Sequence, residues 1–121
     1  MELEKRFKDV TTFEERRKQA EATLEKNPDK IPIICEKQRN SKLENIDRSK
    51  YLVTNKFKVY QFIHQLRKRI NLRQDEALYL FIGSKTLLKS DSNLSEVYER
   101  YKDADGFLYL EYCEYSSFGN Q

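Results

Sequence analysis

The residue best suited to covalent chemistry is a glycine two positions from the end of the chain. The sequence closes with Phe118-Gly119-Asn120-Gln121, shortly after an apolar, strand-like run over residues 107–112. Glycine has no Cβ, so a short tail that carries one can thread a narrow protease and then be activated at its carbonyl carbon. A frayed terminus has the same appearance, and the rest of the sequence must decide between the two interpretations.

The sole histidine and the two cysteines do not suggest a catalytic or metal site. His64 falls in a helical pattern beside a basic run, whereas Cys35 and Cys113 lie in apolar strand-like runs that lack CxxC or zinc spacing. A cysteine nucleophile needs a base, and the base needs a third group to orient it, which the sequence does not provide. We therefore expect two reduced core thiols, no structural disulfide, no metal ligand set and no catalytic residue.

Positive charge is concentrated in the first part of the chain. Residues 1–73 hold 19 Lys and Arg against 11 Asp and Glu, whereas residues 74–121 hold 4 against 9. This asymmetry favours acidic peptides, anionic lipid heads or nucleic acid as partners, without choosing among them. The run Arg67-Lys68-Arg69 with Arg73 is typical of a solvated helix face. No RNA-binding motif with interleaved aromatic residues accompanies it, so we do not expect nucleic acid to bind.

The N-terminal part of the chain reads as helical. Thr12-Phe13-Glu14-Glu15 predicts a capping box that opens a helix of about 12 residues, which ends before Asn27-Pro28. Its few apolar residues, Phe13, Ala20 and Leu24, predict a narrow stripe that rests on a larger body. A short helical turn precedes it around residues 3–10. No run approaches the roughly 20 apolar residues of a membrane span, and no apolar signal segment follows Met1, so we expect folding in the cytosol.

Strands and two further helices follow. Strands are predicted over residues 30–36, 50–53, 78–82 and 107–112, with a short piece at 86–88. Pro32 places the first strand at an edge or a bulge, a second strand over 50–53 suits antiparallel pairing with it, and the apolar run 78–82 predicts a central strand. Helical spacing is clearest in these residues: Val59, Phe62, Ile63, Leu66 and Ile70; then Leu94, Val97, Tyr98 and Tyr101 behind a Ser92 cap.

The predicted order ββαβ(β)αβ indicates an α+β fold, the ubiquitin-like β-grasp with an N-terminal helical extension. At 121 residues and 38% hydrophobic content the chain fits one domain. We divide it into the helical extension, residues 1–28, the β-grasp core, residues 29–115, and a flexible tail, residues 116–121, that carries the candidate processing site.

Several short motifs follow one another along nearly the whole chain. In order they are Phe13-Glu14-x-Arg16, Lys30-Ile31-Pro32-Ile33-Ile34, Asp47-Arg48-x-Lys50-Tyr51-Leu52-Val53, Arg67-Lys68-Arg69-Ile70, Lys102-x-x-Asp105-Gly106-Phe107-Leu108-Tyr109 and Phe118-Gly119. Together they resemble the autophagy ubiquitin-like modifiers, the light-chain-3 and GABA-receptor-associated protein family. The opening Glu4-Lys5-x-Phe7-Lys8 with Thr12-Phe13-Glu14 is nearer to the light-chain-3 branch.

The resemblance implies a carrier protein and not an enzyme. A cysteine protease would cut after Gly119, and E1-like, E2-like and E3-like proteins would pass the glycine to phosphatidylethanolamine, with no other cofactor. Each buried acyl CH₂ contributes about 0.8 kcal/mol and stable anchoring takes about two chains, so one diacyl lipid suffices. The protein is then expected in the cytoplasm and, after conjugation, on autophagosome membranes.

The resemblance also implies a groove for receptor segments that carry an aromatic-x-x-aliphatic motif. Such segments add a strand to an exposed sheet edge, and their alternate side chains fill two pockets. The aromatic pocket would comprise Pro32, Ile34, Lys50, Leu52 and Phe107. The aliphatic pocket would comprise Tyr51, Val53, Phe62, Leu66 and Arg69, while Arg48 and Lys50 would meet acidic flanking residues. Most of these apolar residues, Ile34 and Phe62 above all, equally suit a buried core.

Three departures from the family pattern bear on receptor preference. Thr54 stands where proline is usual, Gln65 where the aliphatic pocket commonly has Ile or Leu, and Val10-Thr11 where the light-chain-3 branch has a basic pair. The depth of the aliphatic pocket and any acidic contacts to the first helix therefore stay open. The alternative function is a β-grasp adaptor in trafficking or cytoskeletal binding, which shares the groove and never uses Gly119.

Overall fold

The computed structural model of the protein describes residues 5–115 and confirms the predicted order of elements. In chain order these are α1 (Phe7–Val10), α2 (Phe13–Lys26), β1 (Lys30–Lys37), β2 (Lys50–Thr54), α3 (Val59–Arg67), β3 (Tyr79–Ile82), β4 (Thr86–Leu87), α4 (Leu94–Tyr101) and β5 (Leu108–Cys113). The predicted tail, residues 116–121 with Phe118 and Gly119, lies outside the described residues.

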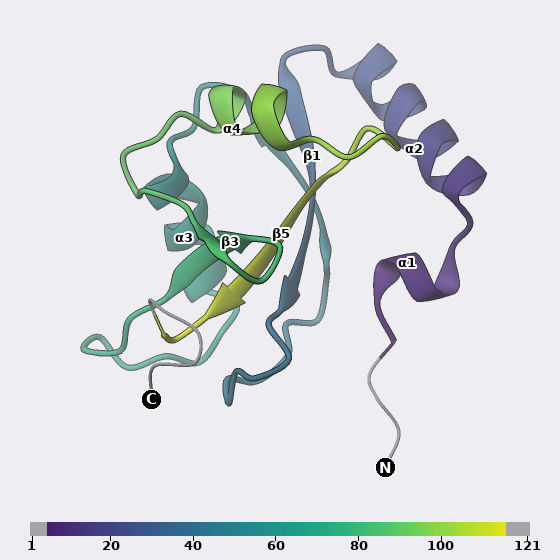
Figure 1. Ribbon diagram of the computed structural model, residues 1–121. Helices are drawn as coiled ribbons and strands as arrows, with labels where there is room; N and C mark the ends of the chain where they lie inside the picture. The colour runs from purple at the N-terminus through teal and green to yellow at the C-terminus, as the bar shows by residue number, and fades with distance from the viewer. Residues whose placement is uncertain (1–4, 116–121) are drawn as a thin grey trace.

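The strands form one mixed sheet in the order β2-β1-β5-β3-β4 (Figure 1). β1 pairs antiparallel with β2 and parallel with β5, whereas β3 pairs antiparallel with β5 and β4. The central strand is therefore β5, and the prediction that residues 78–82 are central is wrong. Leu80 and Phe81 of that run are buried as expected. Burial of both faces of a strand shows that layers cover it above and below, but it does not show which strands lie beside it in the sheet.

The two faces of the sheet carry different layers. α3 and α4 share one apolar cluster with side chains of β1 and β5, among them Ile33, Leu66, Leu94 and Leu108. The helical extension lies on the opposite side (Figure 1), where Ala20 of α2 packs with Ile34 and Phe107. Alternate residues of β1 and β5 thus point to different layers, as the pleat of a strand requires.

The two predicted helix caps differ in their outcome: the one at Thr12 is confirmed and the one at Ser92 is wrong. The Thr12 hydroxyl accepts the Glu15 N–H at 3.1 Å and the Glu15 carboxylate accepts the Thr12 N–H at 2.7 Å, which confirms the capping box. The N-cap of α4 is Asn93 and not Ser92, because the Ser92 carbonyl accepts the Val59 N–H at 2.9 Å and so belongs to the connection with α3.

Two apolar residues differ from the helical patterns, Phe13 in its exposure and Ile70 in its position beyond the end of its helix. Phe13, predicted in the buried stripe, is 45% exposed, since it occupies the first position of α2 and precedes the turn that meets the sheet. α3 ends at Arg67, yet Ile70 stays buried at 2% exposure because its N–H donates to the Leu66 carbonyl at 3.1 Å in the following turn. Cys35 and Cys113 are both free and buried.

Pro32 has no backbone N–H, and it lies at a position of β1 where the neighbouring strand requires no donor. Cys35 donates to Ser49 on the β2 side and Gln38 donates to the Tyr112 carbonyl on the β5 side, so even-numbered residues of β1 direct their nitrogens toward β5. The β1–β5 register begins only at Ile33, paired with Leu108. Pro32 therefore lies just before the ladder that would have required its donor. β1 itself lies between β2 and β5, so the prediction that the first strand is at an edge is wrong.

A buried ion pair fastens α2 to the turn before β5. Arg16 Nε donates to Asp105 Oδ2 at 2.9 Å, and the Asp105 residue is only 1% exposed. The same carboxylate accepts the Phe107 N–H at 2.8 Å and the Tyr109 hydroxyl at 2.5 Å. Burial, together with this hydrogen bond to Asp105, raises the pKa of Tyr109, so its hydroxyl remains a donor.

A second ion pair and a close glycine contact also join the helical extension to the turn before β5. Lys8 Nζ lies 2.9 Å from Asp103 Oδ1, which ties α1 to the same turn. Burial would raise the pKa of Asp103, but hydrogen bonds from Lys8 and from the Asp105 amide outweigh that effect and hold it below its usual range. Gly106 has φ +98°, and a Cβ placed on it would lie 2.8 Å from the Ala20 Cβ.

We predict that Gly106→Ala lowers the free energy of unfolding by about 2 kcal/mol or more, because the methyl group adds a clash with α2 to the strain of a positive φ. Gly83→Ala is the matched control, since Gly83 has φ +61° but open space around its Cβ position. Urea unfolding of both variants measures the difference. Equal losses in the two variants would show that the α2 contact does not constrain this turn.

Candidate functional site

The outer edge of β2 is the exposed edge of the sheet on the side of the helical extension. β2 pairs only with β1, so its outward N–H and C=O groups have no strand partner within the described residues. Its side chains alternate: Lys50 and Leu52 are exposed, with Leu52 at 40%, whereas Tyr51 and Val53 are buried. An extended segment added along this edge would therefore meet a different surface on each face of the strand.

A hollow of about 330 Å³ lies on the α2 face of β2 and is called here the aromatic hollow. Its lining residues are Thr23, Pro32, Arg48, Lys50, Tyr51, Leu52 and Phe107. Four of the five residues predicted for the aromatic pocket are among them. The fifth, Ile34, is fully buried beneath, where it packs with Ala20 and Phe107. Thr23 was not predicted, since nothing in the sequence shows which face of α2 meets the sheet.

One wall of the aromatic hollow is held by polar contacts between the extension and β2. Lys50 Nζ donates to Gln19 Oε1 of α2 at 2.7 Å and lies 5.4 Å from the centroid of the Phe7 ring. Phe7 in turn packs edge-on against Phe107, with centroids 5.5 Å apart. The lining of the hollow thus comes from α2, from β1, from β2 and from the residue before β5, and its shape depends on the extension staying docked.

The opposite face of β2 carries the residues predicted for the aliphatic pocket. Tyr51, Val53, Phe62 and Leu66 are between 0% and 6% exposed and belong to the main core. Only Arg69 is exposed, paired with Asp47 at 3.2 Å. The structure brings the five residues together, but the four apolar ones form a packed wall that offers little surface. Their role in binding stays a prediction.

The hydroxyl of Tyr51 is a buried polar group without a hydrogen-bond partner among the described residues. Its ring packs edge-on against Phe62, with centroids 5.3 Å apart, and lies between the guanidinium groups of Arg48 and Arg69 at 5.2 and 5.8 Å. Burial and Cys35 raise the pKa of Tyr51 to about 12 against the effect of the two arginines. The hydroxyl stays protonated, and a ligand oxygen that reached it would remove the cost of an unsatisfied buried donor.

The departures noted in the sequence lie in three different parts of the structure. Thr54 is partly buried at the end of β2, and Val10 is 61% exposed at the end of α1. Gln65 is exposed and lines another hollow, about 560 Å³, on the solvent side of α3. Tyr60 lines it too at 53% exposure. An aromatic residue outside the buried helical stripe is the sequence signal that could have indicated this hollow.

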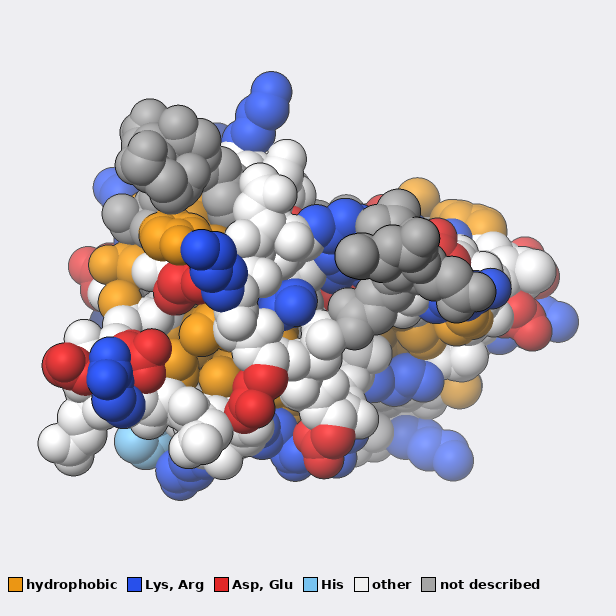
Figure 2. Space-filling model, turned by 90° about the horizontal axis from the view of Figure 1, so that it is seen from below, with side chains coloured by type: hydrophobic (Ala, Val, Ile, Leu, Met, Phe, Trp, Pro, Cys, Tyr) orange, Lys and Arg blue, Asp and Glu red, His pale blue; other side chains and the backbone are white. Residues whose placement is uncertain are grey.

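The basic run after α3 is largely engaged within the fold. Arg67 donates to the carbonyls of Glu76 and Arg73 at 2.6 and 3.0 Å, and Arg69 pairs with Asp47. His64, the sole histidine, is exposed (Figure 2). Figure 2 shows Lys and Arg side chains interspersed with Asp and Glu and not gathered in one patch on that face. These contacts favour a structural role for the run.

Two carboxylates are neighbours on the sheet surface beneath α1. Glu36 of β1 and Glu111 of β5 are paired in parallel register, and Glu36 Oε2 accepts the Phe7 N–H at 2.7 Å. Burial raises the pKa of Glu111 and Glu36 raises it further, while Arg6 and Arg39 act in the opposite direction. The charged form of Glu111 is therefore less stable in the folded protein than in the unfolded chain.

Three comparisons place this geometry among known proteins. A family model described as "Autophagy protein Atg8 ubiquitin like" matches residues 15–119. Autophagy-related protein 8 of Coccidioides immitis is 41% identical over 118 residues, which cover 98% of this chain and 100% of that protein. Autophagy-related protein 8 of Mycosarcoma maydis is 41% identical over 113 residues, 93% of this chain and 95% of that protein.

A solved structure agrees with these sequence matches. The crystal structure of Trypanosoma brucei ATG8 has a TM-score of 0.87 and 40% identity, with 97% of this chain and 100% of that chain covered. The predicted α+β fold of the ubiquitin-like type is confirmed. These relatives carry no branch name, so the position nearer to the light-chain-3 branch stays a prediction.

We predict that Glu111→Gln is more stable than the wild-type protein near neutral pH. Because the folded-state pKa of Glu111 is raised, the wild-type protein gains stability relative to the variant as the pH falls, and the difference disappears below the ordinary value of 4.5. Urea unfolding from pH 4 to pH 8, with the exposed Glu25→Gln as control, measures this difference. A wild-type protein that is the more stable of the two at pH 7 would contradict the prediction.

Proposed function

The chain belongs to the Atg8 family of ubiquitin-like autophagy proteins, and we propose that it is cleaved after Gly119, conjugated to phosphatidylethanolamine and used to recruit receptors. Membership makes it a ubiquitin-like modifier of autophagy, with conjugation proteins and receptors as its general classes of partner. The specific steps are our proposal: a cysteine protease exposes the glycine, E1-like, E2-like and E3-like proteins transfer it, and the protein itself catalyses none of them.

Conjugation through Gly119 is supported by its position. The family match extends to residue 119 and ends there, six residues beyond Cys113, which ends β5. In the described range no helix combines the length and apolar composition needed to cross a bilayer. A diacyl lipid on Gly119 would supply membrane attachment through its buried acyl chains. The protein would then move from the cytoplasm to the autophagosome membrane without a change of fold.

Receptor recruitment rests on one observation: the unpaired edge of β2 borders the aromatic hollow, whose lining includes Arg48 and Tyr51 with its unpartnered hydroxyl. An added strand would satisfy the outward backbone groups of β2 and place its aromatic side chain in the hollow. The side chain three positions later would meet the wall of Tyr51 and Val53. Arg48 and Lys50 would attract acidic residues next to the motif and chiefly raise the association rate.

We predict that Gly119→Ala blocks cleavage or conjugation, because its methyl group enters a channel shaped for none. Mass spectrometry of the protein from starved cells should find the wild type ending at Gly119 with a phospholipid attached and the variant without one. Asn120→Ala, which leaves the glycine intact, is the control. An unprocessed Gln121 terminus in the wild type would favour the non-conjugated adaptor instead.

We predict that a peptide with an acidic-aromatic-x-x-Leu motif binds with micromolar affinity, about −8 kcal/mol, because ordering a flexible peptide offsets much of its contact energy. Leu52→Ala should weaken binding by removing one side of the aromatic hollow. Leu87→Ala is the matched control, since Leu87 is 42% exposed and lies on β4 at the far edge of the sheet. Isothermal titration calorimetry measures both.

Tyr51→Phe separates binding from stability in the same experiment. Removing an unsatisfied buried hydroxyl should leave the free energy of unfolding unchanged or higher, whereas peptide affinity should fall because a donor to the ligand is lost. Chemical-shift changes that centre on residues 67–73 and leave residues 48–53 unmoved would show that the groove is not the binding site.

A further inference from the structure

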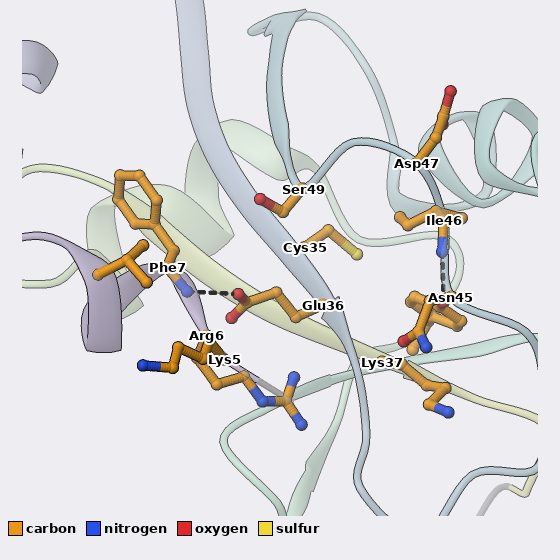
Figure 3. A pocket seen from close by; sticks show the side chains of 12 residues that line it. Lys5, Arg6, Phe7, Cys35, Glu36, Lys37, Asn45, Ile46, Asp47 and Ser49 are labelled. Atoms are coloured by element: carbon orange, nitrogen blue, oxygen red, sulfur yellow. Dashed lines mark hydrogen bonds between the residues drawn. The ribbon is translucent and has the colours of Figure 1, made fainter. Parts of the chain in front are cut away.

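The end of β5 is tied to the loop that joins β1 and β2, residues 38–49, which is called here the β1–β2 loop. The Tyr112 carbonyl accepts the Gln38 N–H at 2.9 Å. The Tyr112 hydroxyl accepts the Ile46 N–H at 3.1 Å, the dashed line at Ile46 in Figure 3, and donates to the Glu44 carbonyl at 2.7 Å. Both ends of the loop are therefore held by one residue of the central strand.

Glu114, the residue after β5, contacts the middle of the same loop with both oxygens of its carboxylate. The Ser41 hydroxyl donates to Oε1 at 2.6 Å, and the Lys42 N–H donates to Oε2 at 3.0 Å. The Cys113 thiol lies 3.6 Å from Oε1 as a further donor. Hydrogen bonds to a charged acceptor are roughly twice as strong as neutral ones, so this arrangement, called here the Glu114 clamp, fixes the direction of the side chain.

The Glu114 carboxylate is charged at neutral pH. Burial would raise its pKa, but hydrogen bonds from the Ser41 hydroxyl and from the amides of Glu114 and Lys42 outweigh that effect and hold it below its usual range. Burial raises the pKa of the Cys113 thiol, which therefore keeps its proton. The acceptor thus keeps its charge while the donors around it keep their hydrogens.

The loop side of the clamp is itself held in one conformation. Ser41 and Gln38 are polar, yet they are only 6% and 7% exposed. The Ser41 N–H donates to the Gln38 carbonyl at 2.9 Å, and the Ser41 oxygen accepts the Leu43 N–H at 3.1 Å. Gln38 Oε1 accepts the Asn40 N–H at 2.6 Å. Buried polar groups that are satisfied in this way make a segment rigid, so Glu114 is fastened to a fixed point.

The sheet is complete without the Glu114 clamp. β5 ends at Cys113, which is paired with Tyr79 of β3, and Tyr112 already holds the β1–β2 loop. Glu114 lies beyond the strand and is partly buried, and its two strong hydrogen bonds go to the loop and not to another strand. The segment that the clamp constrains is therefore the one that follows it in the chain.

That segment is short. Gly119 lies five residues after Glu114. A fully extended chain spans at most about 3.6 Å per residue, so Gly119 can reach no more than about 18 Å from the clamp. A protease that cuts after Gly119 must work close to the folded body, and the point where the tail leaves the body decides how the two proteins meet. Each residue that the fold already orders is one that the protease need not order on binding.

We propose that Glu114 is a positioning residue for cleavage after Gly119, because its clamp on the β1–β2 loop sets the place and direction in which the tail leaves the fold. This inference rests on the proposed function, in which that bond is cut. The reaction is hydrolysis of the peptide bond between Gly119 and Asn120. Water supplies the hydroxyl of the new Gly119 carboxyl group and the hydrogen of the freed Asn120 amine, and Glu114 takes no part in that exchange.

Steady-state cleavage of the full chain by a purified Atg8-processing cysteine protease tests the proposal. Glu114→Ala should raise KM about three- to tenfold and leave kcat within about twofold, since the start of the tail must then be ordered on binding but reacts normally once bound. Ser41→Ala, which leaves the Lys42 hydrogen bond, should raise KM less. Glu25→Ala removes an exposed carboxylate from α2 and is the control.

Further measurements separate positioning from loss of structure and from direct recognition by the protease. Ser41→Ala combined with Glu114→Ala should behave like Glu114→Ala alone, because both changes act on one contact. A synthetic peptide of residues 113–121 and its Glu114→Ala counterpart should be cleaved equally, since neither contains the loop. In the full chain, Glu114→Ala should speed hydrogen exchange at the Lys42 amide. If that variant does not fold, Glu114→Gln, which keeps one acceptor oxygen, replaces it with a smaller expected rise in KM.

Each failure has a distinct meaning. If the wild-type chain is not cut after Gly119, the proposed conjugation is wrong and the inference falls with it. If the wild type is cut and Glu114→Ala leaves KM unchanged, the proposed function stands and the clamp does not position the tail. If Glu114→Ala impairs the peptide as much as the full chain, the protease recognises the side chain directly and the positioning role is wrong.

Discussion

The candidate site depends on the buried ion pair between Arg16 and Asp105. Removing one partner of such a pair commonly lowers the free energy of unfolding by about 3 to 5 kcal/mol. Replacing both partners by well-packed apolar residues often leaves stability unchanged. The main effect of the ion pair is therefore to fix where α2 lies relative to the turn before β5. The Asp105 carboxylate also receives the Phe107 amide and the Tyr109 hydroxyl, and it thereby fixes the start of β5 relative to α2. The aromatic hollow has one wall from the helical extension that this pair holds in place.

Local sequence patterns were sufficient to predict the helices and strands. They were insufficient to predict which of these elements lie side by side. The capping box at Thr12 and the apolar spacing from Val59 to Leu66 are set by residues a few positions apart, and the structure agrees with both. Arg16 and Asp105 lie far apart in sequence, and nothing local to either shows that they meet. The same reason explains the error over residues 78–82, because strand order is a property of distant pairings.

The site was predicted through resemblance more than through pattern. Leu52 and Lys50 lie in the aromatic hollow as the motifs implied. Phe62 and Leu66 are packed core residues. Residue type alone does not show whether an apolar residue belongs to the core or lines a pocket. The unsatisfied hydroxyl of Tyr51 could not be found in the sequence, since it depends on which groups fail to contact it.

The central position of β5 bears on when the protein can fold during its synthesis. β1 and β2 leave the ribosome early, but the inner edge of β1 has no partner until the last of these strands has been made. Pairing between segments distant in sequence is slow to form and leaves strand edges exposed meanwhile. The hairpin of β1 and β2 therefore forms before the rest of the sheet can, and the sheet is completed only once β5 is available.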